Sequence, residues 1–229
     1  MSKTFLFAGA SSAIAKETAK ILNDKGHRVI GISTKDTNSV YSEFHQIEKY
    51  DFGVYPEITD SLDGLVYFPG TINLKPFARL SQAEFINDFQ INSLGAIAFV
   101  QAYLNHLKKS QHGSIVFLSS VAASIGLPFH ASISMAKGAI EGLIRALAAE
   151  FAPSIRVNCV APSLVNTPLG YKFINTPDKM EQMKKRNPLQ KVGDPIDVAQ
   201  AIVFLLLEES AWVSGQVLSI DGGMSKIKN

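Results

Sequence analysis

The sequence predicts an α/β protein: a doubly wound parallel sheet of about seven strands with helices on both faces. Short apolar runs alternate with segments whose apolar residues recur every three or four positions, as strands and crossover helices do. The runs lack strict polar alternation, which is typical of parallel strands covered on both faces. A chain of 229 residues suits one sizeable core, and no linker or repeat interrupts it. We therefore expect a single domain over residues 1–229.

The first half of the chain begins as strand, turn and helix. A helix is expected over residues 14–25, because Gly26 favours a helix end. Residues 34–64 are short for a full crossover, so a helix there is expected to be trimmed or lost. The predicted strands of this half cover residues 4–8, 28–33, 46–52 and 65–68.

The second half continues the alternation. Ser81 and Glu84 form a capping box that opens a long helix to about residue 109. Residues 163–195 are expected to be a substrate-side lobe, irregular to about residue 190. The remaining predicted strands cover residues 115–118, 155–160 and 217–220, and the remaining helices 131–152 and 196–207.

Two hydroxyl residues follow the strand at 115–118. Ser119 and Ser120 stand at its carboxyl end, where open α/β sheets place their ligands. On the next helix Ile133, Lys137 and Ile140 fall three or four residues apart, so one face carries a single lysine toward that strand end. The pattern indicates a ligand site at Ser120 and Lys137.

At these residues the chain resembles the short-chain dehydrogenase/reductase family, close to the 3-oxoacyl-(acyl-carrier-protein) reductases, over residues 4–223. The resemblance implies a Rossmann-type fold and hydride exchange between a nicotinamide dinucleotide and a carbonyl carbon. The family motif is Tyr-x-x-x-Lys with a serine thirteen residues before the tyrosine. Lys137 and Ser120 match it, and Asn92 matches the asparagine that shapes a helix kink and anchors a water in the proton relay. Ile133 occupies the tyrosine position and cannot donate a proton.

His130 is a candidate replacement donor. It lies seven residues before Lys137, where the similar enoyl-(acyl-carrier-protein) reductases place their tyrosine. If the helix extends back past Pro128, both side chains face the same way. A histidine pKa near ~6.5 suits proton donation at pH 7, although a helix N-terminus disfavours the cation. The alternative is an exposed loop histidine. Lys137 itself is a poor acid at neutral pH unless it is desolvated.

The segment from Gly9 to Ala15 joins the first strand to the first helix. Such a turn builds an anion site from unpaired amides and the helix dipole. The family loop is Gly-x-x-x-Gly-x-Gly, so Ala13 and Ala15 replace two glycines, and a plain small-residue helix start is the alternative. The cofactor-binding residues implied here are Gly9, Ser11, Ser12 and Ile14.

The end of the second strand indicates which dinucleotide binds. Ser33, Thr34 and Lys35 stand where NAD-preferring relatives carry an acid. Hydroxyls and a cation suit a 2′-phosphate, so NADP(H) is favoured over NAD(H), although Lys35 also fits a solvated loop. The resemblance implies further cofactor contacts from Asp51 and Phe52 at the adenine, Gly70, Lys137 at the ribose, and Pro162, Val165 and Thr167 at the carboxamide.

Composition excludes several classes of protein. A net charge of +2 gives no reason to expect nucleic acid or an anionic membrane as partner, and no apolar run approaches the ~20 residues of a membrane helix. The single Cys159 excludes an internal disulfide, and no metal site is expected. We expect a cytoplasmic protein with a small-molecule or acyl-thioester substrate. The resemblance implies a homo-oligomer, tetramer or dimer, built on the helices at 82–109 and 131–152.

Three functions remain open at this point. The first is an NADP(H)-dependent reductase or dehydrogenase of carbonyl, acyl-thioester or enoyl substrates with a rearranged proton donor. The second is a dinucleotide-binding pseudoenzyme that serves as sensor or partner subunit, which Ile133, Ala13, Ala15 and Tyr67 favour by departing from the family pattern together. The third is a non-redox lyase or epimerase on the same scaffold. Fold does not decide among them.

Overall fold

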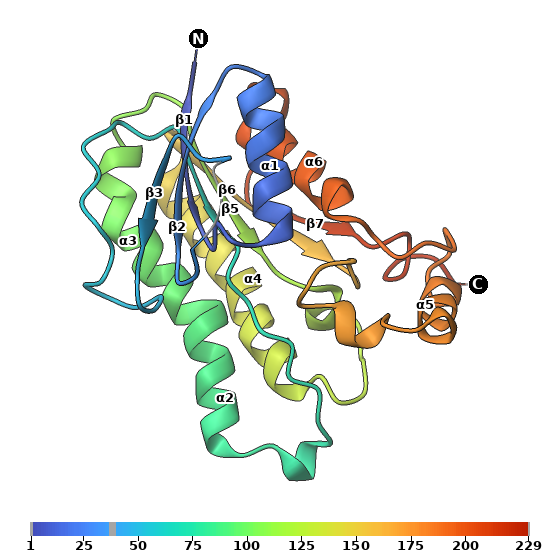
Figure 1. Ribbon diagram of the computed structural model, residues 1–229. Coiled ribbons are helices and arrows are strands. Elements are labelled where there is room, and N and C mark those ends of the chain that lie inside the picture. The colour runs from blue at the N-terminus through green and yellow to red at the C-terminus, as the bar shows by residue number, and fades with distance from the viewer. Residues whose placement is uncertain (1, 37–39, 229) are drawn as a thin grey trace.

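The computed structural model describes residues 2–36 and 40–228 and shows a parallel sheet between two layers of helices (Figure 1). Within these residues the strand order is β3-β2-β1-β4-β5-β6-β7, and every neighbouring pair is parallel. The predicted doubly wound sheet is confirmed. The order reverses between β1 and β4, the switch point at which such sheets bind ligands. The strands are β1 Thr4–Ala8, β2 Arg28–Ser33, β3 Glu43–Gln46, β4 Gly64–Tyr67, β5 Gly113–Leu118, β6 Ile155–Pro162 and β7 Val217–Ile220.

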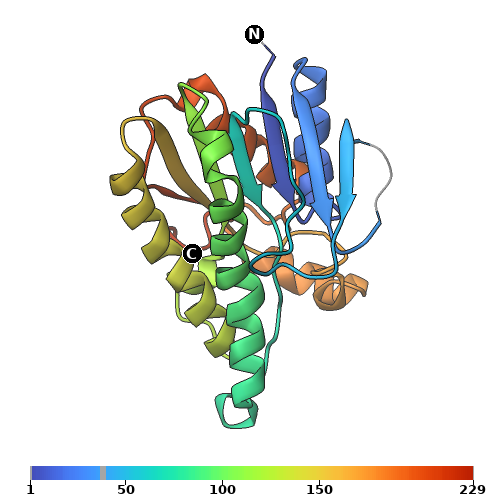
Figure 2. The ribbon, with the colours of Figure 1, turned by 90° about the vertical axis from the view of Figure 1, so that its left-hand side faces the viewer.

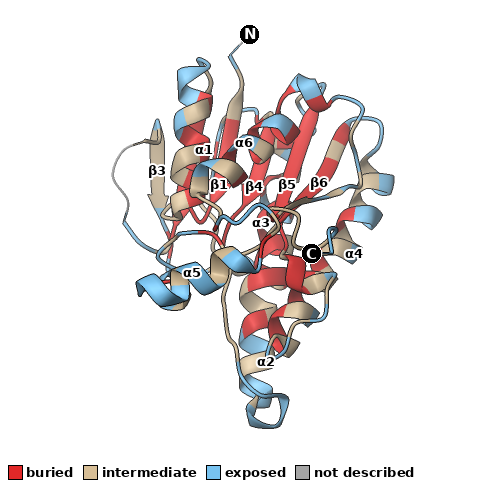
Figure 3. Ribbon diagram, turned by 90° about the vertical axis from the view of Figure 1, so that its right-hand side faces the viewer, coloured by how far each residue is buried: buried red, intermediate tan, exposed pale blue. Residues whose placement is uncertain are grey.

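Side chains alternate between two cores along each strand. Phe5 and Phe7 of β1 point to the face covered by α1 and α6, while Leu6 and Ala8 point to the face covered by α3 and α4. The central strands β1, β2, β4, β5 and β6 and the inner faces of these helices are mostly buried, whereas the edge strands β3 and β7 are partly exposed and α5 is largely exposed (Figure 3). Below the sheet α2 and α4 lie side by side (Figure 2). The helices are α1 Ala13–Asp24, α2 Gln82–Phe89, α3 Gly95–Leu107, α4 Ala131–Phe151, α5 Pro177–Lys185 and α6 Pro195–Leu206.

The third strand lies earlier than predicted. β3 pairs Glu43–Gln46 with the last four residues of β2, so Gln46 stands opposite Ser33 at the end of the sheet edge. Residues 47–52 have no strand left to pair with, and the strand predicted at 46–52 is wrong. The chain instead turns away after Ile47, whose amide donates to the Ser33 carbonyl at 3.0 Å. The described part of residues 34–63 contains no helix, as expected.

The long helix predicted at 82–109 forms as two helices joined by a π turn at Gln90–Leu94. Its predicted capping box is present: the Glu84 amide donates to Ser81 Oγ at 3.3 Å, and the Ser81 amide donates to Glu84 Oε2 at 3.0 Å. The π turn is supported from β4, because the buried Tyr67 hydroxyl donates to the Ile91 carbonyl at 2.7 Å. A methyl group at Gly95 would overlap that hydroxyl, so glycine is required there.

The lobe at 163–195 is more ordered than predicted. It contains a short 3-10 turn at Tyr171–Phe173 and the helix α5, which Thr176 caps and Pro177 starts. Lys172 Nζ donates to the Ile72 carbonyl at 3.0 Å and so joins the lobe to the segment that follows β4. Across the described ranges, no helix combines the length and apolarity that a bilayer crossing requires.

Candidate active site

The loops after β1 and β4 meet at the switch point of the sheet. Gly9 adopts φ +78°, a conformation that favours glycine, and its amide donates to the Ile32 carbonyl at 2.8 Å. A Cβ at Gly9 would lie 2.8 Å from Pro69 Cδ, so a larger residue would separate the two loops. Gly9 and the Pro69–Gly70 segment therefore lie next to one another at the carboxyl end (the rim) of the sheet.

Lys137 reaches this rim from α4. Its side chain is buried, and Nζ donates to the Leu118 carbonyl at the end of β5 at 2.8 Å. A Cβ at Gly70 would lie 3.5 Å from the same nitrogen, so the loop after β4 covers the amine. Burial lowers the pKa of Lys137 from 10.5 to about 8, and the nearby Cys159 thiol opposes this only in part. Among the described residues Leu118 is the one hydrogen-bond partner of Nζ, which leaves two donors for a ligand.

The two serines after β5 have different surroundings. Ser119 is buried and donates to Glu141 Oε1 on α4 at 2.7 Å, which ties the strand end to the helix. Ser120 is partly exposed, and its Oγ accepts from the Ala122 amide at 3.2 Å. Its hydroxyl hydrogen is not used in that bond. Ser120 therefore offers a donor two residues beyond the carbonyl that binds Lys137.

Ile133 lies one helical turn before Lys137 and is 4% exposed. It contributes only hydrocarbon to the site. The next residue, Ser134, donates to the Ala122 carbonyl at 2.7 Å. No buried or half-buried tyrosine of the described structure takes the place of the missing phenol beside Lys137. Their hydroxyls donate to other groups: Tyr41 to Ala10, Tyr50 to Ser33, Tyr55 to Gly95, Tyr67 to Ile91 and Tyr103 to Pro56.

Asn92 lies in the π turn, where the expected kink occurs. Its Nδ2 donates to Thr71 Oγ1 and to the Asp88 carbonyl, each at 2.8 Å, and its Oδ1 accepts from the Thr71 amide at 3.3 Å. A Cβ at Gly70 would lie 3.2 Å from that Oδ1. The structure thus brings Asn92, Gly70 and Lys137 together, as the sequence indicated.

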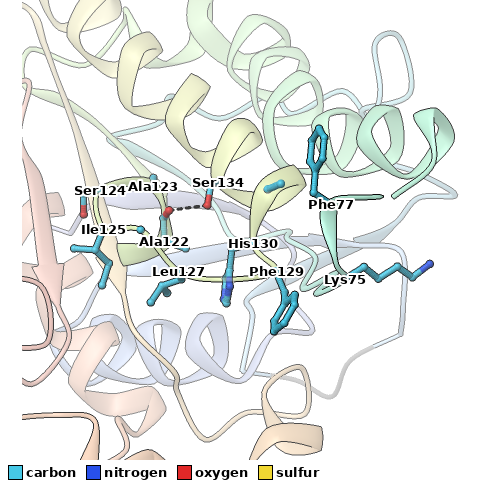
Figure 4. A pocket seen from close by; sticks show the side chains of 12 residues that line it. Lys75, Phe77, Ala122, Ala123, Ser124, Ile125, Leu127, Phe129, His130 and Ser134 are labelled. Carbon is cyan, nitrogen blue, oxygen red and sulfur yellow. Dashed lines mark hydrogen bonds between the residues drawn. The ribbon is translucent and has the colours of Figure 1, made fainter. Parts of the chain in front are cut away.

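His130 does not share a helical face with Lys137. The helix begins at Ala131, as predicted, because Phe129 has φ +70° and cannot continue a right-handed helix backward. The condition for a shared face, a helix that extends back past Pro128, is therefore not met. His130 Nδ1 donates to the Pro128 carbonyl at 2.7 Å, which leaves Nε2 as the unprotonated nitrogen of the neutral ring. Its side chain lines an open cavity of about 380 Å³ together with Ser134 and Lys75 (Figure 4).

The loop between β1 and α1 is where the sequence predicts an anion site. Ser12 is the N-cap of α1, yet no side chain of the described residues caps the helix and its first turn carries no acid. The first-turn amides, including that of the buried Ile14, remain available to a ligand. Ser11 Oγ accepts from Ser33 Oγ at 2.9 Å, which ties the loop to β2. Uncapped amides beside a buried amine with two open donors fit a pyrophosphate and a ribose.

The residues at the end of β2 differ in what they contact: Ser33 binds the loop after β1, whereas Lys35 is exposed to solvent. Ser33 is fully buried and its hydroxyl binds Ser11, so it holds the loop and does not present its hydroxyl to solvent. Thr34 is partly buried and its amide donates to the Tyr50 hydroxyl at 3.3 Å, whereas Lys35 is exposed. Tyr50 was missed from the sequence because it reaches β2 from a loop that follows β3.

Asp51 and Phe52 do not lie at the end of β3. Asp51 forms an ion pair with Lys49 at 2.9 Å, whose hydrogen bond lowers the Asp51 pKa, and Phe52 is half exposed. The position after the strand belongs to Ile47 and Glu48. These two, with Thr34, Gln46, Val54 and Pro56, line a hollow of about 690 Å³. Glu48 was not predicted at this hollow because the sequence placed it inside a strand at 46–52.

Residues after β6 lie at the same rim. Pro162 ends β6, and the buried Val165 forms an isolated bridge with Gly193 of the lobe. Thr167 Oγ1 accepts from the Gly170 amide at 3.2 Å, which fixes a compact turn. The three predicted residues therefore lie at or just beyond the carboxyl end of β6, the strand that neighbours β5. In the described ranges no cluster of His, Cys, Asp and Glu is suited to hold a metal ion.

Comparisons with known proteins agree with this geometry. A family model described as Enoyl-(Acyl carrier protein) reductase matches residues 52–225. A tropinone reductase homologue of Arabidopsis thaliana is 32% identical and aligns with 97% of this chain and 79% of its own. The 3-oxoacyl-[acyl-carrier-protein] reductase of Thermotoga maritima is 31% identical, with 97% of each chain covered.

Solved structures show the same fold. The ligand-free aldohexose dehydrogenase of Thermoplasma acidophilum has a TM-score of 0.86 and 25% identity, with 100% of this chain and 97% of that chain covered. ElxO with NADP bound has a TM-score of 0.85 and 27% identity, with 98% and 99% covered. Because the family model and the curated relatives span most of the sequence, the chain belongs to the short-chain dehydrogenase/reductase family.

Proposed function

We propose that this chain is an NADP(H)-dependent reductase or dehydrogenase of a carbonyl, acyl-thioester or enoyl substrate with an atypical proton donor. The observation that carries the proposal is the buried Lys137 amine, which has two open donors at the rim where Ser120 presents its hydroxyl. The family relation supports the oxidoreductase class, and ElxO with NADP bound is a structural neighbour. The exposed Lys35 and the absence of an acid at residues 33–35 support the 2′-phosphate preference.

The cofactor site is assigned to the rim residues already described. The uncapped amides of α1 and Gly9 would hold the pyrophosphate, Lys137 the ribose, and the segment from Pro162 to Thr167 the carboxamide. When bound, the nicotinamide supplies or accepts a hydride. The protein then has to bind the substrate oxygen and move one proton. Ser120 donates a hydrogen bond to that oxygen in this scheme.

We assign the proton to Lys137, because Ile133 stands where the family motif has its tyrosine. A lysine with a pKa of about 8 is a far better acid near neutral pH than one with an ordinary pKa. Lys137 is a poor acid at neutral pH unless its amine is desolvated, and its burial provides that desolvation. His130 is the competing donor when its imidazole is protonated, because Nε2 then carries a proton in the cavity beside Ser134. Replacing His130 by Phe separates the two: turnover persists if Lys137 is the donor and is lost if His130 is.

A dinucleotide-binding pseudoenzyme is the second candidate. Ile133 is buried and carries no proton, and the buried tyrosine hydroxyls donate elsewhere in the described residues. In that case the site binds the cofactor and changes shape or partner without turnover.

Two measurements test the proposal. NADPH and NADH are titrated by fluorescence, and cofactor oxidation is then followed with a panel of 3-oxoacyl and enoyl thioesters and simple ketones. Saturable NADPH binding with oxidation supports the reductase, and binding without oxidation supports the pseudoenzyme. No saturable binding of either dinucleotide contradicts both.

A matched pair of variants then examines Ile133. Ile133→Tyr adds a ring and a hydroxyl, and Ile133→Phe adds the ring alone. If the site has lost its donor, only the tyrosine variant gains turnover, by about 10² or more, the usual contribution of a positioned general acid. Equal turnover rates in both variants contradict the view that the missing phenol is what limits turnover.

We further infer a homo-oligomer. Ile86 on α2 and Met135 on α4 are exposed apolar side chains on two helices that pack side by side. Light scattering with Met135→Glu tests this: the expected result is dissociation of an oligomer, and a wild-type monomer contradicts it.

A further inference from the structure

A buried carboxylate lies beside the proposed active site. Asp88 on α2 is 1% exposed, and each of its oxygens accepts one hydroxyl at 2.6 Å, Oδ1 from Thr71 and Oδ2 from Ser132. No cation pairs with it among the described residues. A buried carboxyl group is unfavourable unless it is hydrogen-bonded, and here the two hydroxyls that satisfy it come from two different segments.

The carboxylate connects the segment that follows β4 to α4, the helix that carries Lys137. Thr71 Oγ1 donates to Asp88 and accepts from Asn92 Nδ2, and the Thr71 amide donates to Asn92 Oδ1. Thr71 is therefore held at three points, and Gly70 before it lies near the Lys137 amine, which a Cβ at Gly70 would approach to 3.5 Å. On the other side Ser132 belongs to α4, the helix that carries Lys137.

We propose that Asp88 is a positioning residue: it joins Thr71 to Ser132 and thereby keeps Gly70 closed over Lys137. This inference rests on the proposed function in taking Lys137 as the working amine. Its geometry does not require a cofactor, so it is testable on the ligand-free protein. Water reaches the amine if the clamp at Thr71 opens, because Gly70 is then free to move away.

The pKa of Lys137 measures whether Gly70 keeps water away from the amine. Burial is the main reason why this pKa lies near 8, so entry of water raises it toward 10.5. The titratable group that faces the amine from β6 is Cys159, whose pKa burial raises to about 12, so the thiol stays neutral in this range. Glu141, next along α4, accepts from Ser119 and keeps its place in all the variants below.

The experiment titrates the lysine ε-carbons by ¹³C NMR in dinucleotide-free protein, with the Lys137 signal assigned by its loss in Lys137→Met. Asp88→Leu and Thr71→Val should raise the Lys137 pKa by about one unit or more, a tenfold change in proton affinity. Ser93→Ala is the matched control: it removes a buried 2.8 Å hydrogen bond from the same turn to the Ala136 carbonyl and leaves Thr71 untouched. It should leave the Lys137 pKa unchanged.

Asp88→Asn separates positioning from charge. An asparagine accepts from Thr71 and donates to Ser132, so it should keep the Lys137 pKa near the wild-type value. A charge effect has the opposite sign, because losing a carboxylate lowers the pKa of a nearby lysine. A fall of the Lys137 pKa in Asp88→Asn therefore overturns the positioning role in favour of a charge effect. Wild-type titration in Thr71→Val overturns the inference altogether, even if Asp88→Leu fails to fold.

A dinucleotide titration distinguishes this inference from the proposed function. If wild type does not bind NADPH, the proposed function fails while the NMR result still decides the role of Asp88. If it binds, Thr71→Val should raise the dissociation constant about fivefold or more, and Ser93→Ala should leave it within about twofold. Equal effects of the two variants contradict a positioning role.

Discussion

Replacing Lys137 by Met is expected to remove a pH-dependent cost that the native fold carries. The pKa of Lys137 falls from 10.5 to about 8 on folding because its side chain is buried. At about 1.36 kcal/mol per unit, this difference corresponds to roughly 3 kcal/mol of destabilisation while the amine is protonated. Methionine has a similar length and fills the same space without charge. The Leu118 carbonyl loses its donor in exchange, which costs about 1–3 kcal/mol at every pH.

The sign of the pH dependence follows from the two pKa values. Below pH 8 the amine is protonated in both the native and the unfolded states, so the native state carries the full cost. Between pH 8 and 10.5 the native state loses the proton first, and stability rises with pH. Above 10.5 both states are neutral and the cost is gone. The stability of Lys137→Met minus that of wild type should therefore fall by about 3 kcal/mol from pH 7 to pH 10.5.

Urea unfolding at half-unit steps across this range measures the difference. Other titrating groups are common to both proteins and cancel. Lys185→Met, at an exposed position of α5, is the control and should show a difference that does not vary with pH. A flat difference for Lys137→Met would refute the reasoning, because the amine would then be hydrated in the native state and Gly70 would not cover it.

Three further predictions concern the kink and the cofactor. Tyr67→Phe removes the hydrogen bond to the Ile91 carbonyl and should cost about 0.5–1.5 kcal/mol in urea unfolding; no loss would mean that water replaces the hydroxyl. Gly95→Ala should destabilise wild type more than it destabilises Tyr67→Phe, because the overlapping hydroxyl is absent there, and additive effects in this cycle would contradict the contact. Lys35→Glu should weaken NADPH relative to NADH by about tenfold in fluorescence titrations, and an unchanged ratio would count against the 2′-phosphate preference.

Strands buried on both faces were predictable from the sequence. The predicted bounds of β1 and β2 agree with the structure, because continuous apolar runs reflect burial between two helix layers. The predicted bounds of β7 also agree, although this strand lies at the sheet edge and is partly exposed. β3 was misplaced for the converse reason. It is a four-residue edge strand of mixed polarity, partly exposed along its length, so it lacks an apolar run. The apolar residues Ile47 and Phe52 beyond it drew the predicted strand downstream.

The candidate site was predictable where spacing along one element decides the geometry. Ser120, Lys137 and Asn92 lie where the motif and the helical period place them. Contacts between distant segments left no such signal: Tyr50 reaches Thr34 from another loop, and Asp88 reaches Thr71 and Ser132 through tertiary packing. The placement of His130 depended on a helix start that the backbone of Phe129 determines.

The locally unfavourable features of this chain gather at one place. A buried protonatable amine, a buried carboxylate without a cation and a π turn all border Gly70 or Thr71. Neither apolar core requires them, since the faces of the sheet are filled by aliphatic and aromatic side chains. Departures from local rules that converge in this way mark a working site. In the proposed function, Ile133 stands where the family motif has a tyrosine, while Lys137 is retained although its burial is unfavourable for the charged amine. In that proposal the amine acts without a tyrosine, and ligand binding and proton transfer are the roles that its two open donors and its pKa allow.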